Sequence, residues 1–307
     1  MVKLRNIGRI VIIFLGMITG ARAQYNPVQS LFSYNTMYVN PANTGIMGKG
    51  SVFLWHRTQW AGFDGAPNTA MLSLEYPLKK MAFGANVYYD YSDIVTQTFG
   101  AGYFSYLLNL DYSTYLSLGL NLGVRQIKLD PTKLNVKDPG EPYFDEVTTA
   151  TDIVSGVGLT VFNEKWYAGL SIPNIIPYKG LSTGDNLERS FTPKIYLAGG
   201  MNVELSYNVF FRPSLFIYYG KDITPGFELT SNFILKDKLS AGLGYRYGSA
   251  YILMLGYKFS DVFSIGYSYD WDTHDLHRYN KGTHELFMRF EFDTKNERVR
   301  FQSPRFF

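Results

Sequence analysis

Strict alternation of apolar and small polar residues constrains this chain more than any other feature. Between residues 239 and 248, leucine, alanine and tyrosine hold the odd positions, while serine, glycine and arginine hold the even ones. The same two-residue period recurs in 81–90, 116–125, 251–260, 263–271 and 285–292. A period of two sends alternate side chains to opposite faces of a β-strand. We therefore expect an all-β fold.

The second face of these strands indicates which kind of β-protein this is. A soluble sandwich would carry Lys, Glu and Thr on its solvent face, but here that face holds Gly, Ser, Asn and single charges. Such a face is typical of a barrel lumen, and apolar faces that end in aromatics, as at Tyr269 and Trp271, are typical of membrane girdles. With 17% aromatic and 18% charged residues, the composition also excludes disorder.

The pattern predicts an antiparallel transmembrane β-barrel of the outer membrane, with about 14 strands in residues 51–293. Connections after even-numbered strands are short, whereas three connections after odd-numbered strands are long, at 129–150, 173–190 and 272–282. Short periplasmic turns and longer outer loops would place both termini in the periplasm. Pro213 predicts a bulge in its strand. The expected strands span 51–60, 68–76, 81–91, 96–108, 113–128, 151–163, 165–172, 191–205, 208–220, 225–235, 238–248, 250–259, 262–271 and 283–293.

The two ends of the chain differ from the barrel in composition. Residues 1–23 have a basic start, an apolar run at 10–18 and an Ala21-Arg22-Ala23 cleavage site, which together predict a secretory signal peptide. The alternative is a membrane anchor helix, but such a helix needs about 20 apolar residues. We expect 24–50 to be a periplasmic or lumenal segment and 294–307 a periplasmic tail.

The lumen of such a barrel has to be filled. About fourteen strands enclose more space than side chains alone can occupy, so we expect the N-terminal segment or loops to fill it. Asn40-Pro41 is predicted to stop this segment and turn it into the first strand. Gly62 and Gly65 should supply flexible φ angles in the first outer hairpin, while Pro67 fixes the start of the second strand.

Charged residues on the inward face are the next candidates for a site. Arg57 and Gln59 should project into the lumen, where Arg57 either pairs with Glu75 or holds the N-terminal segment. His56, Arg57 and Glu75 form either a ligand-binding polar cluster or, as we favour, a set of pairs that stabilises a filled lumen. Isolated buried charges are costly, so we also expect pairing on the wider lumenal face. That face contains Arg125, Arg246 and Arg289 with Glu204, Glu285 and Glu291.

Catalytic and metal-binding patterns are hard to find. The chain has no Cys, no G-x-S-x-G and no H-E-x-x-H, so we expect neither an enzyme nor a cofactor. A net charge of +3 does not favour nucleic-acid binding. One loop gathers histidine and aspartate and is either a cation site or, as we favour, a solvated outer loop. Its residues are His274, His277, Asp270, Asp272 and Asp275.

Two stretches resemble a known family. Tyr38 to Gly45 reads Y-V-N-P-A-N-T-G, and His56 to Pro67 reads H-R-T-Q-W-A-G-F-D-G-A-P. Both are similar to signatures of the PorP/SprF family of type IX secretion proteins from the outer membrane of Bacteroidota, and the last strand, from Thr283, fits as well. The resemblance implies a barrel that helps to export cargo or to attach it to the surface, in the apparatus that also serves gliding.

The same resemblance implies partners. These would be other type IX secretion components, periplasmic ring or peptidoglycan-associated proteins, and cargo with a C-terminal sorting domain, in addition to outer-membrane lipid or lipopolysaccharide. The resulting hypothesis is a non-enzymatic accessory or docking barrel. The alternative is an outer-membrane channel or transporter for a small or hydrophobic solute.

Overall fold

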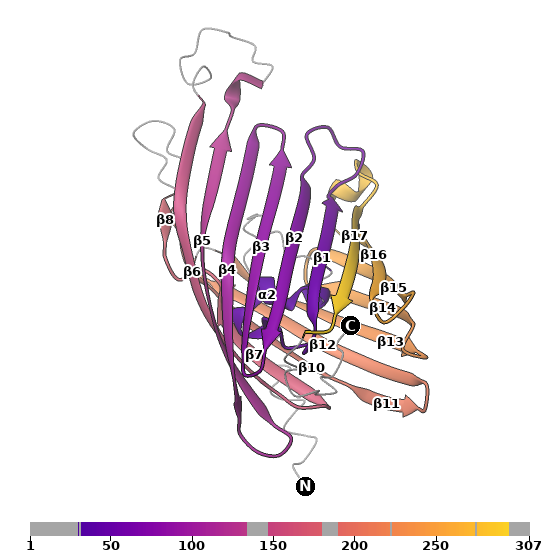
Figure 1. Ribbon diagram of the computed structural model, residues 1–307. Coiled ribbons are helices and arrows are strands. Elements are labelled where there is room, and N and C mark those ends of the chain that lie inside the picture. The colour runs from indigo at the N-terminus through magenta and orange to yellow at the C-terminus, as the bar shows by residue number, and fades with distance from the viewer. Residues whose placement is uncertain are drawn as a thin grey trace, which may run out of the picture.

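The computed structural model describes residues 30, 32–133, 147–179, 190–221, 223–273 and 275–294. Most of these residues belong to one antiparallel sheet that closes on itself (Figure 1). No helix in the described ranges is long and apolar enough to span a membrane. The expected signal peptide, most of the C-terminal tail and much of the two longest loops lie outside the described residues.

The strands follow each other around the barrel in chain order. From β1 to β7 and from β12 to β17 each strand pairs with the next one in the chain, and β17 pairs with β1. Their bounds are β1 Gly50–Thr58, β2 Asn68–Leu78, β3 Met81–Ser92, β4 Val95–Asn109, β5 Tyr115–Leu129, β6 Thr148–Phe162, β7 Trp166–Ile172, β10 Lys194–Met201, β11 Val203–Ser206, β12 Val209–Gly220, β13 Ile223–Leu235, β14 Leu239–Arg246, β15 Ala250–Lys258, β16 Phe263–Asp272 and β17 Thr283–Phe292.

Closure depends on one interrupted strand. β10 and β11 are two parts of the same strand position, because both pair with β12. β10 also pairs with β7, which completes the ring. The described residues therefore form a closed barrel of fourteen strand positions, as predicted, while β8 (Tyr178–Lys179) and β9 (Ser190–Phe191) form a separate ribbon.

The predicted bulge at Pro213 is wrong. Gly200 pairs with Ser214 and Val203 pairs with Phe211, so the register of β10 and β11 on β12 does not shift across the proline. Instead, the ladder is interrupted there, between Met201 and Val203. Proline has no backbone N–H to donate to a neighbouring strand. The interruption therefore lies beside a residue that lacks this hydrogen-bond donor.

The side-chain alternation is also confirmed. Leu243 on β14 is 67% exposed and Leu253 on β15 is 43% exposed, as expected for lipid-facing residues. Their strand neighbours Gly242, Ile252 and Met254 are buried inside. The apolar outer surface and closed hydrogen-bond ladder meet the requirements for a sheet that spans a membrane.

The two mouths of the barrel differ. One mouth has connections of two to five residues, at 79–80, 110–114, 163–165, 207–208, 236–238 and 259–262. We call this mouth the short-turn end, and the opposite mouth the loop end. β1 begins and β17 ends at the short-turn end.

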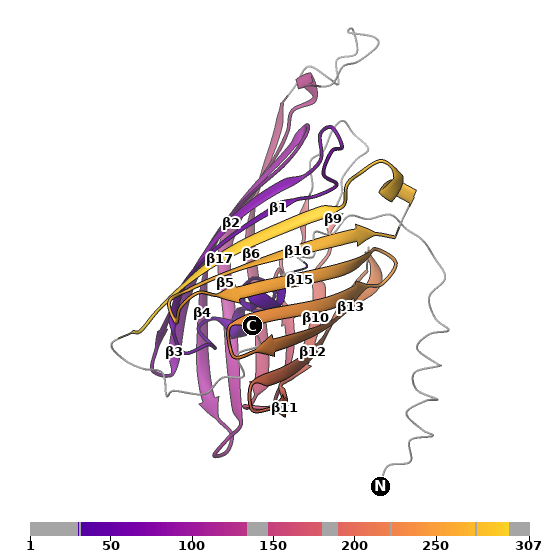
Figure 2. The same cartoon turned by 90° about the vertical axis from the view of Figure 1, so that its right-hand side faces the viewer.

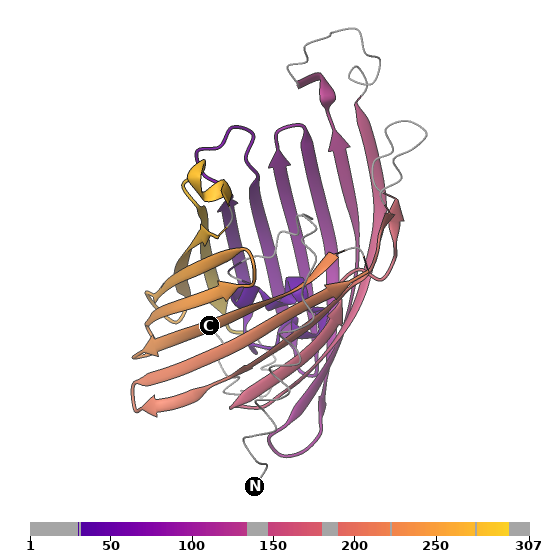
Figure 3. The same ribbon diagram turned by 180° about the vertical axis from the view of Figure 1, so that it is seen from behind.

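The N-terminal segment lies inside the barrel. It forms η1 (Phe32–Tyr34), α2 (Thr36–Val39) and η2 (Pro41–Asn43), and the ring of strands surrounds these turns in two further views (Figures 2 and 3). We call Ser30 together with residues 32–46 the plug. Met37 and Ala42 have no exposed surface, so the plug is packed as deeply as a protein core.

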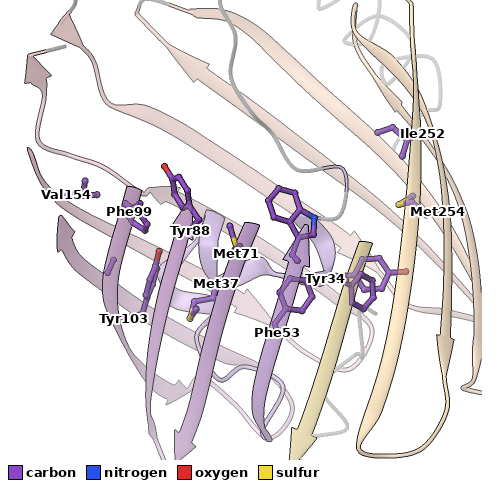
Figure 4. Close-up of a cluster of buried hydrophobic side chains, with 13 residues drawn as sticks. Tyr34, Met37, Phe53, Met71, Tyr88, Phe99, Tyr103, Val154, Ile252 and Met254 are labelled. Atoms are coloured by element: carbon purple, nitrogen blue, oxygen red, sulfur yellow. The ribbon is translucent and has the colours of Figure 1, made fainter. Parts of the chain in front are cut away.

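Aromatic and methionine side chains surround the plug. Met37 and Tyr34 belong to one cluster of buried side chains with Phe53, Met71 and Tyr88 of the strands (Figure 4). Most of the plug residues are buried among the strands. The expectation that the N-terminal segment fills the lumen is therefore confirmed for the described residues.

Candidate functional site

The best-defined site is the surface on which the plug docks. It runs along the inner face of β4 to β7, and we call it the docking wall. Three wall serines each donate a side-chain hydrogen bond to a plug carbonyl, which satisfies backbone groups that would otherwise be buried without partners. The bonds run from Ser105 to Thr44 (2.7 Å), Ser117 to Ala42 (2.6 Å) and Ser171 to Val39 (2.7 Å).

Asn40 and Pro41 form the centre of this contact. Asn40 Oδ1 accepts a hydrogen bond from Ala42 N at 3.0 Å and so caps η2, and Asn40 Nδ2 donates to Thr160 Oγ1 at 2.9 Å. Pro41 opens η2, where its missing N–H costs nothing. The expectation that the pair turns the chain directly into the first strand is wrong, because β1 begins only at Gly50.

Glycines on the inner face let the plug approach closely. A Cβ on Gly119 would lie 2.1 Å from Ala42 N, and a Cβ on Gly158 would lie 2.0 Å from Asn40 Oδ1. On β3, a Cβ on Gly84 would lie 2.4 Å from Met37 Sδ. The Gly and Ser that alternate along these strands thus form a surface shaped to the plug.

A buried ion network holds the other end of the plug. Glu285 accepts from Ser30 N at 3.0 Å through Oε1 and from Trp55 Nε1 at 3.2 Å through Oε2. The same Oε1 lies 3.5 Å from Arg57 Nε. Glu285 has no exposed surface and Arg57 is 4% exposed. Arg57 therefore holds the plug through a shared carboxylate.

Arg246 forms the second half of this network. Its Nε donates to Glu228 Oε2 at 2.7 Å and its Nη1 donates to Asp270 Oδ2 at 3.1 Å. Its Nη2 donates to Ser30 Oγ at 2.6 Å, and Ser30 Oγ itself donates to Asp270. Removing one member of such a buried network leaves a charge uncompensated, which costs about 3–5 kcal/mol.

The predicted pair of Arg57 and Glu75 is wrong. Glu75 is level with Ser51 on β1, while Arg57 is level with Thr69 on β2. Arg57 lies six residues beyond Ser51, or about 20 Å along an extended strand. Glu75 contacts the plug instead, because its Oε2 accepts from Gly45 N at 2.6 Å. Both residues thus hold the plug, at different depths.

His56 does not belong to the lumenal cluster. It is exposed on the outer face of β1, whereas Arg57 and Gln59 are buried on the inner face. The prediction that Arg57 and Gln59 project inward agrees with this burial. Adjacent residues of one strand cannot share a face, which excludes the grouping of His56 with Arg57.

The hairpin between β1 and β2 has two glycines with positive φ angles. Gly62 has a φ of 87° and Gly65 a φ of 74°, a region that favours glycine. A Cβ on Gly65 would also lie 2.9 Å from Asp93 Cβ. Pro67 precedes β2 and its carbonyl accepts from Gln59 N at 2.9 Å, which closes the loop.

The other charged residues that were expected on the lumenal face have different surroundings. Arg125 is 8% exposed, and its Nη2 lies 3.7 Å from Asp152 Oδ2 on β6. Arg289 is also buried and donates from Nη2 to the carbonyl of Tyr34 in the plug. Glu291 lies 3.7 Å from Lys49. Glu204 pairs with Phe210 and so lies on the same face of the sheet as Arg212, but it is exposed near the short-turn end.

The histidine and aspartate loop does not form one cluster. Asp270 is 1% exposed and belongs to the plug network, while His277 is exposed at the loop end. His274 lies outside the described residues. Within the described ranges, no group of three or more His, Asp or Glu side chains is arranged to hold a metal ion.

Several important residues were not singled out from the sequence. They are Ser30 in the plug, Ser105, Ser117, Thr160 and Ser171 on the docking wall, and Glu228 in the ion network. The alternating Ser, Gly and Asn on one face of these strands predict that the residues face the lumen. The pattern does not predict which segment of the chain packs against them.

A family model described as "Type IX secretion system membrane protein PorP/SprF" matches residues 21–290. No curated protein matches the chain. Among solved structures, the CymD monoaromatic hydrocarbon channel aligns with a TM-score of 0.54 at 13% identity, over 90% of this chain and 96% of that chain. The Ralstonia pickettii toluene transporter TbuX aligns with a TM-score of 0.53 at 10% identity, over 90% and 95%. At these identities, the likeness concerns the barrel fold.

Proposed function

Because this chain belongs to the PorP/SprF family of type IX secretion system membrane proteins, we propose that it is a non-enzymatic accessory or docking barrel of that system. It would sit in the outer membrane and support the secretion or surface attachment of cargo. The observation that carries the docking role is the plug, which occupies the lumen between the docking wall and the ion network.

The plug favours docking over conduction. A channel needs a continuous path, but here Met37, Ala42 and Thr44 are fully buried within the lumen. The contacts on the plug include a buried ion network, which is costly to disrupt. A barrel that is closed in this way presents two fixed mouths and an apolar belt, which are surfaces for binding other proteins.

The lengths of the connections support one orientation of the barrel in the membrane. We assign the short-turn end, and both chain termini, to the periplasm, and the loop end to the cell exterior. Periplasmic ring or peptidoglycan-associated proteins would then meet the short-turn end. Cargo with a C-terminal sorting domain and other secretion components are the remaining expected partners, and lipopolysaccharide would surround the outer belt.

Affinity purification from gently solubilised membranes tests this function. A tagged copy of the full chain should enrich type IX secretion components over an equally abundant tagged barrel from another pathway. Loss of the chain should also leave secreted cargo inside the cells. If the tagged chain enriches none of these components and secretion is normal without it, the docking role is wrong.

The alternative is transport of a small or hydrophobic solute. CymD and TbuX are described as a hydrocarbon channel and a toluene transporter, and they share the barrel fold. At 13% and 10% identity this likeness does not extend to their solutes. Uptake of a labelled aromatic hydrocarbon that depends on this chain would favour the alternative.

A further inference from the structure

The part of β6 at the loop end has a neighbouring strand on one side only. β6 pairs with β5 along its whole length, from Thr148 to Phe162. β7 pairs with β6 only between Phe162 and Val157, because β7 ends at Ile172. Residues 148–156, which we call the β6 edge, therefore have no second strand among the described residues. In Figure 1 this part of β6 extends toward the loop end beyond β7.

The β6 edge presents backbone groups that no described part of the chain satisfies. Alternate residues of an antiparallel strand direct their backbone groups to opposite sides. Ser155 O accepts from Ile175 N, so Ser155 directs its backbone groups away from β5. Thr149, Thr151 and Ile153 follow the same period, but their N–H and C=O groups meet no described partner. Such a row of donors and acceptors is a template for a further strand.

The β6 edge begins inside the apolar belt of the barrel. On the outer face, Ile153 is 59% exposed and level with Val124 of β5, which is 50% exposed. The next outward pair toward the loop end, Thr151 and Gln126, is polar. Open sheet edges do not occur in contact with hydrocarbon. The backbone of Ile153 therefore requires a hydrogen-bonding partner that lipid tails cannot supply.

The β6 edge also lacks the features that usually keep a sheet edge from pairing. Natural edges are blunted by lysine, proline, bulges or short length. Residues 148–156 read T-T-A-T-D-I-V-S-G and contain neither lysine nor proline. Their register on β5 is continuous, so no bulge twists them away. The one charged residue is Asp152, whose Oδ2 lies 3.7 Å from Arg125 Nη2. This edge is therefore competent to pair.

A second copy of this chain does not fit the β6 edge. Two copies in one membrane would be related by an axis along the membrane normal. Their β6 strands would run in the same direction across the membrane and tilt to opposite sides, each by about 35–45°. The two strands would then cross at roughly 70–90° and could not form a ladder.

We propose that the β6 edge binds an extended segment of a different protein, which adds to the sheet as a further strand. In this mode of recognition, backbone hydrogen bonds supply affinity and alternate side chains supply specificity. The segment would place an apolar residue beside Ile153 and polar residues beside Thr151 and Thr149. The inference rests on the proposed docking role and specifies how one partner is held at the loop end.

A synthetic peptide with the sequence of residues 121–129 is a suitable probe, because this part of β5 already pairs with β6. On the opposite edge of β6 it would be a copy of β5 displaced by two strand positions. Val124 of the peptide would then lie beside Ile153, and Arg125 beside Asp152, as in the β5–β6 pair. Fluorescence anisotropy should show saturable binding of the labelled peptide to the full chain in lipid nanodiscs.

Two methylated peptides give the first matched comparison. N-methylation at Val124 and Gln126 removes N–H groups that would face the β6 edge. It should weaken binding by about tenfold or more, because backbone hydrogen bonds are lost. N-methylation at Arg125 and Ile127 removes N–H groups that would face away, and should weaken binding much less. Equal affinities of the two methylated peptides, or no binding of the parent peptide, would overturn the proposal.

The second comparison uses variants of the chain at one position. Thr151→Pro removes an N–H of the β6 edge without removing a bond to β5, and proline is tolerated on edge strands. It should weaken binding of the peptide by about tenfold or more, whereas Thr151→Val should bind like the parent. Unchanged affinity in folded Thr151→Pro would contradict the site. If that variant fails to fold, the two methylated peptides on the parent still decide.

Affinity purification then separates the edge from the docking role. Tagged Thr151→Pro should recover less of at least one type IX secretion component or cargo protein than tagged Thr151→Val does. Equal recovery by the two variants would overturn the assignment of a partner to this edge. A parent chain that binds the peptide as expected but enriches no secretion component would contradict the docking role and not the strand-binding edge.

Discussion

The side-chain amide of Asn40 donates to Thr160 Oγ1 over 2.9 Å and so joins the plug to β6, 120 residues later in the chain. Thr160 Oγ1 in turn donates to Asn43 Oδ1 at 2.7 Å. One buried threonine hydroxyl therefore satisfies two plug asparagines. Such a fully bonded buried network favours a single docked position.

Thr160→Val should loosen the plug while keeping the barrel. The substitution keeps the shape of the side chain but leaves the amides of Asn40 and Asn43 without this partner, which costs about 1–3 kcal/mol. Hydrogen exchange of residues 40–45 should become faster. Thr149→Val, on the outer face of the same strand, is the control and should change nothing in this segment. Equal protection in the two variants would contradict the docking contact.

Gly119→Ala should displace the plug from the docking wall. The new Cβ would lie 2.1 Å from the backbone nitrogen of Ala42, which a flexible side chain cannot relieve. We expect increased protease cleavage within residues 32–46. Gly102→Ala provides the control, because its Cβ would approach no atom closer than 4.0 Å. If the two alanines behave alike, the close approach is not required.

Leu243→Arg should destabilise the barrel by roughly 2–4 kcal/mol if this residue faces lipid near the middle of the membrane. Leu243 is 67% exposed on the outer face of β14. Ser264→Ala, on the inner face of β16, should cost much less. The measurement is reversible folding into lipid vesicles, and similar losses for both variants would contradict the assigned faces.

Tags inserted in 129–150, 173–190 or 272–282 should be reached by antibodies on intact cells. A tag between Lys236 and Asp237 should be reached only after the outer membrane is permeabilised. This difference follows from placing the short-turn end in the periplasm. Surface labelling at Lys236-Asp237 would reverse the orientation.

The strand order and the facing of residues could be predicted because they depend on local sequence. A period of two fixes the face of each side chain, so Leu243, Arg57 and Arg125 were placed correctly. The depth of a residue along the barrel depends on pairing register. The β1–β2 hairpin pairs Thr58 with Asn68, and counting back from that pair would have separated Arg57 from Glu75.

The docking contacts could not be predicted in the same way. Ser117 and Thr160 are ordinary inward residues, and nothing local shows that Ala42 and Asn40 will lie against them. These contacts join segments 75 and 120 residues apart, and the closed barrel brings them together. The Asn40-Pro41 turn was recognisable as a turn, but its place inside the lumen follows only from the complete fold.

Single-channel conductance in planar bilayers tests the central claim most directly. The plug should keep the parent protein nearly non-conducting. Arg57→Ala should conduct more, because it leaves Glu285, which holds Ser30, without its partner guanidinium. Arg278→Ala at the loop end should behave like the parent. A large, steady conductance in the parent would contradict the docking account and favour a transporter.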